Sequence, residues 1–272
     1  MRGRYYTKGV IIVHSVKPEE SIRKRHSKRQ QKRRRQQLIR RCISLSTLSA
    51  IVLCVIIFAT PLLNIRNVSI SGNIKIDSAE LEPIAESFKG HNLILTGKGS
   101  VEKALLPFAY TESVSVKRGL FPPALNIVIT EREPVAQLVH NQSYVTIDID
   151  GKILEVGERN TEYAEIIGLK LTSSNAGEII SLDDNGKLKT VIGVLTSFKK
   201  SGLFAGVTKI SLENMDNITF NYENRIDGVC GPYVDFTRKL GLFREAITSN
   251  KLTENSRGTI DLTKTGKAVY TP

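Results

Sequence analysis

Residues 33–63 read RRRQQLIRRCISLSTLSAIVLCVIIFATPLL, and the charge pattern changes abruptly between Arg41 and Cys42. The 22 residues from Cys42 to Leu63 include no Asp, Glu, Lys or Arg. As an α-helix this stretch would rise about 33 Å, which is enough to cross the hydrocarbon core of a bilayer. The sequence therefore predicts a single transmembrane helix at residues 42–63.

The charge of the chain is concentrated before this helix. Residues 1–41 hold 15 of the 39 Lys and Arg but only 2 of the 27 Asp and Glu, so they carry +13 and the remainder carries −1. A basic flank beside a membrane span stays on the cytoplasmic side. Residues 1–41 are therefore expected to form a cytoplasmic tail, with the C-terminal part beyond the cytoplasmic membrane. The topology determinants nearest the span are Arg33, Arg34, Arg35, Arg40 and Arg41.

Two other interpretations of the N-terminal region are weaker. A nucleic-acid-binding arm is disfavoured because the basic run has low complexity and directly adjoins an apolar segment, whereas nucleic-acid-binding domains carry basic charge on a folded face. A cleaved signal peptide is disfavoured because 41 residues precede the apolar run and no A-x-A pattern follows it. An uncleaved anchor explains both features.

Residues 65–132 have the pattern of a compact α/β domain. A strand is expected at 65–70, two helices at about 78–88 and 100–108, and two strands at 113–117 and 125–129. Asp77-Ser78 and Ser100 are the expected helix caps. The order is β-α-α-β-β, and Pro134 marks its end.

Residues 134–262 are expected to form a β-rich mixed domain with two packing helices. Hairpins are predicted at 145–156 around Asp150-Gly151 and at 207–222. One helix is expected at about 187–200, and a second after Gly231-Pro232 with Pro in its first turn. The last strand is expected at 258–262, followed by a C-terminal tail at 263–272. The fold class is α+β.

Each candidate catalytic, metal or cofactor motif in the sequence is either incomplete or better explained by an ordinary structural role. Asp148-Ile149-Asp150-Gly151 lacks the remaining ligands of a calcium loop and fits a hairpin turn. Gly97–Ser100 is too short for a phosphate-binding loop. Cys230 is the only cysteine after the span, so an internal disulfide is excluded there. We expect no enzymatic activity, no cofactor, no small-molecule substrate and no nucleic acid.

Several phrases resemble the FtsQ/DivIB family of bacterial cell-division proteins. The basic tail and span precede IRNVSISGN (65–73), and the most specific phrase is LNIVITEREPVA (125–136). The hairpin VTIDIDGKIL (145–154) follows, and TIDL (259–262) with GKAVY (266–270) is similar to the closing strands of the family. The resemblance covers roughly residues 20–272.

The resemblance implies a POTRA domain at 65–132, a β domain at 134–262 and no enzymatic activity. It also implies a scaffold role at the division septum, with FtsB/DivIC-like and FtsL-like proteins as partners. Relatives bind a partner strand along the last strand of the β domain. On that basis the expected partner-binding residues are Thr259, Ile260, Asp261, Leu262, Thr263 and Lys264. The alternatives are an envelope-assembly POTRA protein of another class or an unrecognised extracytoplasmic enzyme.

Overall fold

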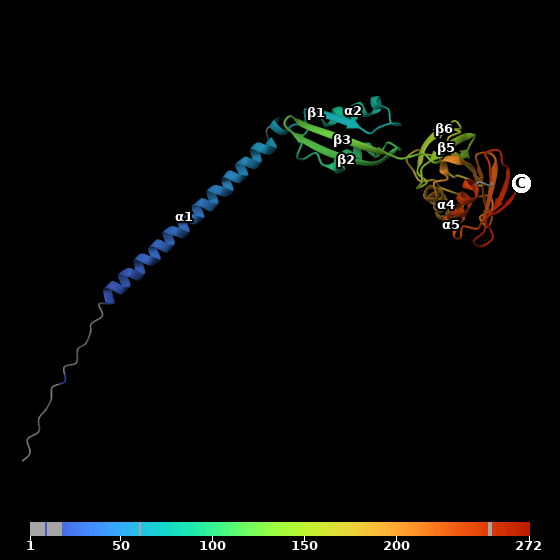
Figure 1. Ribbon diagram of the computed structural model, residues 1–272. Helices are drawn as coiled ribbons and strands as arrows, with labels where there is room; N and C mark the ends of the chain where they lie inside the picture. Colours follow the sequence, from blue (N-terminus) through green and yellow to red (C-terminus); the bar gives the residue numbers. More distant parts are fainter. Residues whose placement is uncertain (1–8, 10–17, 60, 250–251) are drawn as a thin grey trace, which may run out of the picture. The chain divides into compact units, whose positions relative to one another are not determined.

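The computed structural model describes Gly9 and residues 18–59, 61–249 and 252–272. The chain divides into two compact units, residues 1–63 and residues 64–272. Each is described separately below (Figure 1).

The first unit is dominated by one long helix, α1 (Pro18–Ala59). Its segment Arg34–Ile56 is long and apolar enough to cross a membrane, and its most apolar window has no side chain buried in protein. Thr60 lies outside the described residues, and Pro61–Leu63 form a short 3-10 helix, η1. The α-helix therefore covers residues 42–59 of the predicted span.

The basic residues expected to set the topology lie on α1. Arg34, Arg35, Arg40 and Arg41 are exposed on the helix, whereas the side chain of Arg33 lies outside the described part of the chain. Residues 1–8 and 10–17 of the expected tail are also outside it. Within the described residues, the tail from Pro18 onward continues the helix of the apolar segment.

The second unit begins with the predicted β-α-α-β-β order. Its elements are β1 (Asn67–Ser71), α2 (Ser78–Phe88), α3 (Lys98–Leu105), β2 (Thr111–Leu120) and β3 (Pro123–Glu131). The sheet order is β1-β3-β2, with β3 parallel to β1 and antiparallel to β2. Its own apolar cluster includes Leu81, Leu93, Val101, Leu125 and Ile127.

The predicted caps in this region had different outcomes. Asp77 caps α2 as expected, because its carboxylate accepts a hydrogen bond from the Ala79 amide at 3.0 Å. Ser100 does not cap α3, which begins at Lys98 after Gly97. The Ser100 amide instead bonds to the Gly97 carbonyl, so Ser100 is already inside the first turn.

The rest of the unit is a nine-stranded sheet with the order β12-β11-β10-β9-β8-β7-β4-β5-β6. Its strands are β4 (Ala136–His140), β5 (Ser143–Ile147), β6 (Ile153–Gly157), β7 (Ala164–Ile167), β8 (Val207–Ser211), β9 (Ile218–Tyr222), β10 (Ile226–Gly231), β11 (Gly258–Asp261) and β12 (Val269–Thr271). Both predicted hairpins, β5–β6 and β8–β9, are present. The fold class predicted from the sequence is confirmed.

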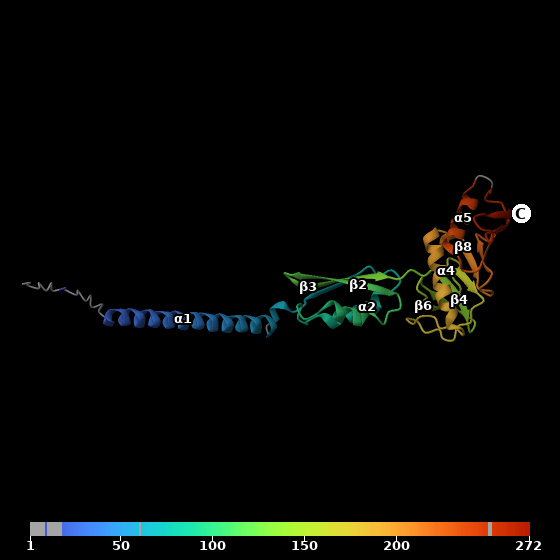
Figure 2. The same cartoon turned by 90° about the horizontal axis from the view of Figure 1, so that it is seen from below.

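Two helices pack on this sheet, as expected. They are α4 (Leu188–Ser201) and α5 (Phe236–Thr248), and Figure 2 shows them side by side against the strands. The proposed first-turn position for Pro232 is wrong, because α5 begins four residues later at Phe236. The apolar faces of the helices join the sheet in a second cluster that includes Phe198, Phe220, Leu240 and Phe243. The two apolar clusters lie on either side of Pro134, the predicted boundary.

In the phrase Glu131-Arg132-Glu133-Pro134, Glu131 makes polar contacts within its own region, whereas Arg132 and Glu133 pair with residues of the following region. The Glu131 carboxylate accepts hydrogen bonds from the amides of residues 74–76 at 2.8–3.0 Å. Arg132 pairs with the buried carboxylate of Asp148 in the β5–β6 turn. Glu133 pairs with Lys199 at 3.2 Å, but both of these side chains are largely exposed. Of these two ion pairs, only Arg132–Asp148 is shielded from water. Breaking a shielded ion pair costs more free energy than breaking an exposed one, because it leaves a buried charge without its partner.

Limited proteolysis of residues 64–272 should yield resistant fragments on either side of Pro134, because each side has its own apolar cluster. Arg132→Gln should accelerate cutting there, since it leaves the Asp148 carboxylate without its cation. Lys199→Ala is the matched control, and it should leave the rate unchanged because its ion pair is exposed. Resistance of the whole unit, with cuts only inside one region, would contradict the proposed boundary.

Candidate functional site

The end of the nine-stranded sheet differs from the sequence-based expectation. The segment Thr259–Lys264 was predicted to be an open edge, but β11 lies between β10 and β12. β12 runs antiparallel to β11, with Thr259 opposite Thr271 and Asp261 opposite Val269. The predicted C-terminal tail at 263–272 therefore contains a strand, and β12 is the last strand of the sheet. The sequence analysis placed the free edge at β11, whereas the structure has it at the neighbouring strand, β12.

The direction of the backbone groups shows what β12 presents. The amides of Gly258 and Leu262 bond to carbonyls on the β10 side, at 3.2 and 2.8 Å. Backbone groups alternate in direction along a strand, so those of Thr259 and Asp261 face β12. Their partners Thr271 and Val269 then point back to β11. The N–H and C=O of Tyr270 point outward, which makes this residue the outward-facing member of the edge strand.

Two features hold β12 in place. Gly258 has φ +150°, and a Cβ atom at this residue would lie 2.2 Å from the Thr271 carbonyl oxygen. Only glycine allows β12 to approach so closely. The Tyr270 hydroxyl donates a hydrogen bond to the Arg257 carbonyl at 2.7 Å, which ties the centre of β12 to the residue preceding β11.

The six predicted site residues differ in burial. Ile260, on β11, and Leu262, directly after it, are both buried. Thr259 and Asp261 are half-buried, while Thr263 and Lys264 are exposed in the connection to β12. The Thr263 hydroxyl and amide donate hydrogen bonds to Asp261, and these bonds lower the pKa of its carboxyl group. Thr259, Ile260 and Asp261 thus pair with β12, and Leu262–Lys264 lead into the connection that precedes it. Their role in binding a partner stays a prediction.

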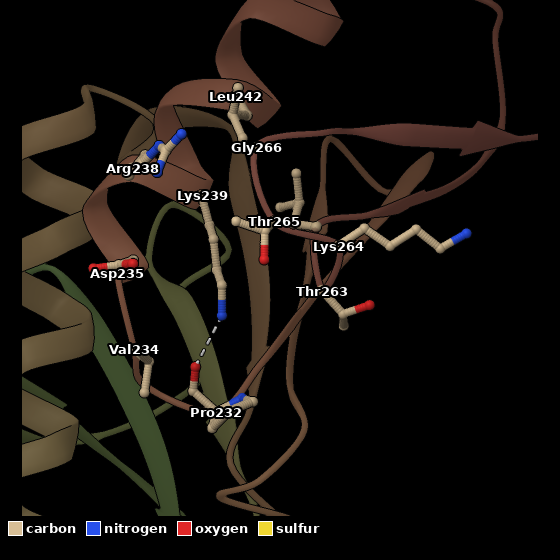
Figure 3. Close-up of a pocket in the computed structure, with 11 residues that line it drawn as sticks. Pro232, Val234, Asp235, Arg238, Lys239, Leu242, Thr263, Lys264, Thr265 and Gly266 are labelled. Carbon is tan, nitrogen blue, oxygen red and sulfur yellow. Dashed lines mark hydrogen bonds between the residues drawn. The ribbon is translucent and has the colours of Figure 1, made fainter.

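A pocket of about 300 Å³ lies beside the connection that leads from β11 into β12 (Figure 3). One wall comes from α5 and carries Arg238 and Lys239, and the other is the connection Thr263–Gly266. The Lys239 ammonium is occupied, because it donates hydrogen bonds to the carbonyls of Cys230 at 2.7 Å and Pro232 at 3.2 Å. Figure 3 shows the Lys264 side chain directed away from α5. The pocket is therefore a recess beside this connection and lacks a convergent cationic centre.

The described residues contain no group of three or more His, Cys, Asp or Glu side chains placed to hold a metal ion. Cys230 is fully buried on β10, and burial raises the pKa of its thiol to about 12. A thiol in this environment is neutral at physiological pH and is a poor nucleophile. It is also inaccessible to a second chain.

Comparisons with known proteins agree with this architecture. Residues 63–132 match the family model for the POTRA domain, FtsQ-type. Cell division protein DivIB of Clostridium acetobutylicum is 24% identical over 213 residues, which cover 77% of this chain and 83% of the relative. Cell division protein FtsQ of Corynebacterium glutamicum is 24% identical over 117 residues, which cover 43% of this chain and 52% of the relative.

Among solved structures, the major extracytoplasmic domain of DivIB from Geobacillus stearothermophilus is similar at 10% identity, with a TM-score of 0.30. The match covers 45% of this chain and 96% of that structure.

The sequence and fold together define a POTRA-containing protein with an N-terminal apolar helix and a sheet-rich C-terminal domain. The resemblance to the FtsQ/DivIB family of bacterial cell-division proteins is confirmed by the POTRA match and by the similarity to DivIB and FtsQ.

Proposed function

We propose that this protein is a membrane-anchored, non-enzymatic scaffold of the bacterial division complex. It is held by one span, with its N-terminus in the cytoplasm and residues 64–272 outside the cytoplasmic membrane at the division septum. Its partners are FtsB/DivIC-like and FtsL-like proteins. The similarity to DivIB and FtsQ supports the division role, and the charge step at Arg41 supports the orientation.

The outward edge of β12 is the observation on which the partner-binding proposal rests. An extended partner segment can add to a free strand edge through main-chain hydrogen bonds, while neighbouring recesses receive its side chains. The nine-stranded sheet ends at β12, and the recess between α5 and Thr263–Gly266 lies at the connection that leads into β12. This geometry fits a partner that binds as an additional strand.

Affinity capture tests the proposal directly. The full chain, tagged at its N-terminus, is crosslinked in dividing cells and purified, and FtsB/DivIC-like and FtsL-like proteins are expected among the captured proteins. The matched control is a chain truncated after Lys267, which lacks β12 but retains β11. Capture of no division protein by the full chain, or equal capture by both chains, would contradict the proposal.

Cysteine labelling tests the orientation. In a chain with Cys42 and Cys54 replaced by Ser, Ser115→Cys is on an exposed position of β2 and should react with an impermeant maleimide applied to intact cells. Ser27→Cys should react only after the membrane is permeabilised. Cys230 is an internal control, because its buried thiol should react only after denaturation. Labelling of Ser27→Cys in intact cells would overturn the N-in orientation.

A further inference from the structure

We propose that one end of the POTRA domain inserts apolar side chains into the lipid surface beside the transmembrane span. This end consists of residues 64–66, 92–96 and 118–123, and it is called the hairpin end below. The proposal adds a second membrane contact to the single span, and it depends on residues 42–59 crossing the bilayer.

The sheet register places the three segments of the hairpin end together. Asn67, the first residue of β1, is opposite Ala124 on β3, and Ala124 is opposite Gly119 on β2. The β2–β3 turn at 120–123 therefore lies at the end of the sheet where β1 begins. The Arg66 amide bonds to the Pro123 carbonyl at 2.9 Å, which confirms this proximity.

The loop at 92–96 lies at the same end. Asn64 forms a bridge with Asn92, and the Ile65 amide bonds to the His91 carbonyl at 2.9 Å. The Arg118 guanidinium donates a hydrogen bond to the Thr96 carbonyl at 2.9 Å, which connects the loop to β2. Segments separated by more than 50 residues thus meet beside the start of β1.

The hairpin end exposes large apolar side chains. Phe121, at the tip of the turn, is 92% exposed, and Leu95, in the loop, is 67% exposed. Leu120 and Ile94 are also exposed, at 54% and 47%. Single exposed apolar residues are common, but four that gather at one end of a small domain form a surface that favours removal from water.

The charge of the hairpin end is complementary to an anionic lipid surface. Residues 64–66, 92–96 and 118–123 contain two basic residues, Arg66 and Arg118, and no Asp or Glu. Among the described residues, Arg66 and Arg118 take part in none of the ion pairs, although Arg118 donates to Thr96. Basic residues next to apolar side chains are typical of surfaces that bind headgroups and the outer acyl region.

The short connection between the span and β1 favours the lipid surface as the binding partner of the hairpin end. Asn67 is four residues after Leu63, so the start of β1 lies within about 14 Å of the end of η1, whatever the orientation of the two units. That distance is about twice the thickness of the interfacial layer on one side of a bilayer, which is roughly 5–8 Å, so the hairpin end remains within reach of the lipid surface. The membrane is therefore present at high local concentration beside Phe121 and Leu95, whereas any other partner must first be recruited.

The opposite end of the same sheet provides a matched control site. Ile74 is 88% exposed, but it follows the last residue of β1 and bonds through its amide to Glu131 at the end of β3. It is a similarly exposed apolar side chain on the same domain, at the end of the three-stranded sheet opposite the start of β1.

Fluorescence of single-tryptophan variants tests the proposal in the full chain. The sequence has no Trp, so Phe121→Trp and Ile74→Trp each create a single emitter at an exposed position. Each chain is reconstituted into vesicles of phosphatidylcholine and phosphatidylglycerol, and flotation selects the anchored fraction. Emission is then measured with acyl-brominated lipid and with acrylamide in the aqueous phase.

For Phe121→Trp we expect blue-shifted emission, shielding from acrylamide and quenching by brominated lipid about twofold or more above that of Ile74→Trp. Adding Arg66→Gln should reduce the dependence of this quenching on phosphatidylglycerol and leave the signal in pure phosphatidylcholine.

Equal lipid quenching of Phe121→Trp and Ile74→Trp would overturn the proposal. Shielding of Phe121→Trp from both quenchers would overturn it as well, since protein would then cover the tip. If the chain does not float with the vesicles, the result would contradict both the transmembrane span and the lipid contact.

Discussion

Phe198→Ala should lower the free energy of unfolding of the β domain by about 3–5 kcal/mol, because it removes a fully buried ring from a close-packed core. The Phe198 ring on α4 has ring centroids of three other aromatic residues at 5.0–5.9 Å, all in edge-to-face arrangements. These rings come from the residues after α4, from β9 and from α5, so one substitution weakens the joint between both helices and the sheet. Urea unfolding of residues 64–272 measures the effect.

Phe121→Ala is the matched control for this prediction. It removes the same ring from a position that is 92% exposed, and it should change the free energy of unfolding by no more than about 0.5 kcal/mol in the absence of lipid. A small effect of Phe198→Ala, comparable to that of Phe121→Ala, would contradict the packing of α4 and α5 on the sheet.

Tyr270→Pro should weaken capture of the strand-adding partner by about tenfold or more relative to Tyr270→Ala. Proline removes the outward N–H of β12, and its ring occupies the space needed by the partner carbonyl, while the bonds from Val269 and Thr271 to β11 remain. The loss of one main-chain hydrogen bond contributes about 1 kcal/mol, and the steric conflict adds to it.

Tyr270→Ala is the control that separates the backbone from the side chain. It loses the ring and the hydrogen bond from the hydroxyl to Arg257 but keeps the outward N–H. Titration of each variant with the purified partner measures the two affinities, and circular dichroism verifies that the sheet remains. Equal affinities for Tyr270→Pro and Tyr270→Ala would rule out strand addition at β12.

Local sequence patterns predicted the elements whose signals lie within a short window. The apolar faces of α2, α4 and α5 repeat at helical spacing, and the β5–β6 and β8–β9 hairpins alternate with a period of two, so each was recognisable. The start of α5 was misplaced because Pro232 favours a first helical turn, whereas the chain here first passes through Asp235 at φ 51°. Local propensity identified the helix but not its first residue.

The edge of the sheet was not predictable in the same way. β12 is a strand of three residues, Val-Tyr-Thr, which is too short for a periodic signal, and its pairing partner β11 precedes it by a loop with no hairpin signature. Whether Thr259–Asp261 or Val269–Thr271 forms the edge depends on which segment pairs with which. Gly258 allows the close approach of Thr271, and the need for glycine at this position is apparent only once the pairing of β11 with β12 is known.

The sequence by itself determined the apolar helix, the charge step at Arg41 on which the proposed orientation rests, and the α+β order of the two regions, since each depends on composition or on periodicity along the chain. Only the tertiary structure decided that β12 closes the sheet and that the segments carrying Leu95 and Phe121 lie at the same end of the three-stranded sheet, where β1 begins. These features depend on the register between segments distant in sequence, and register is set by the packing of the whole sheet.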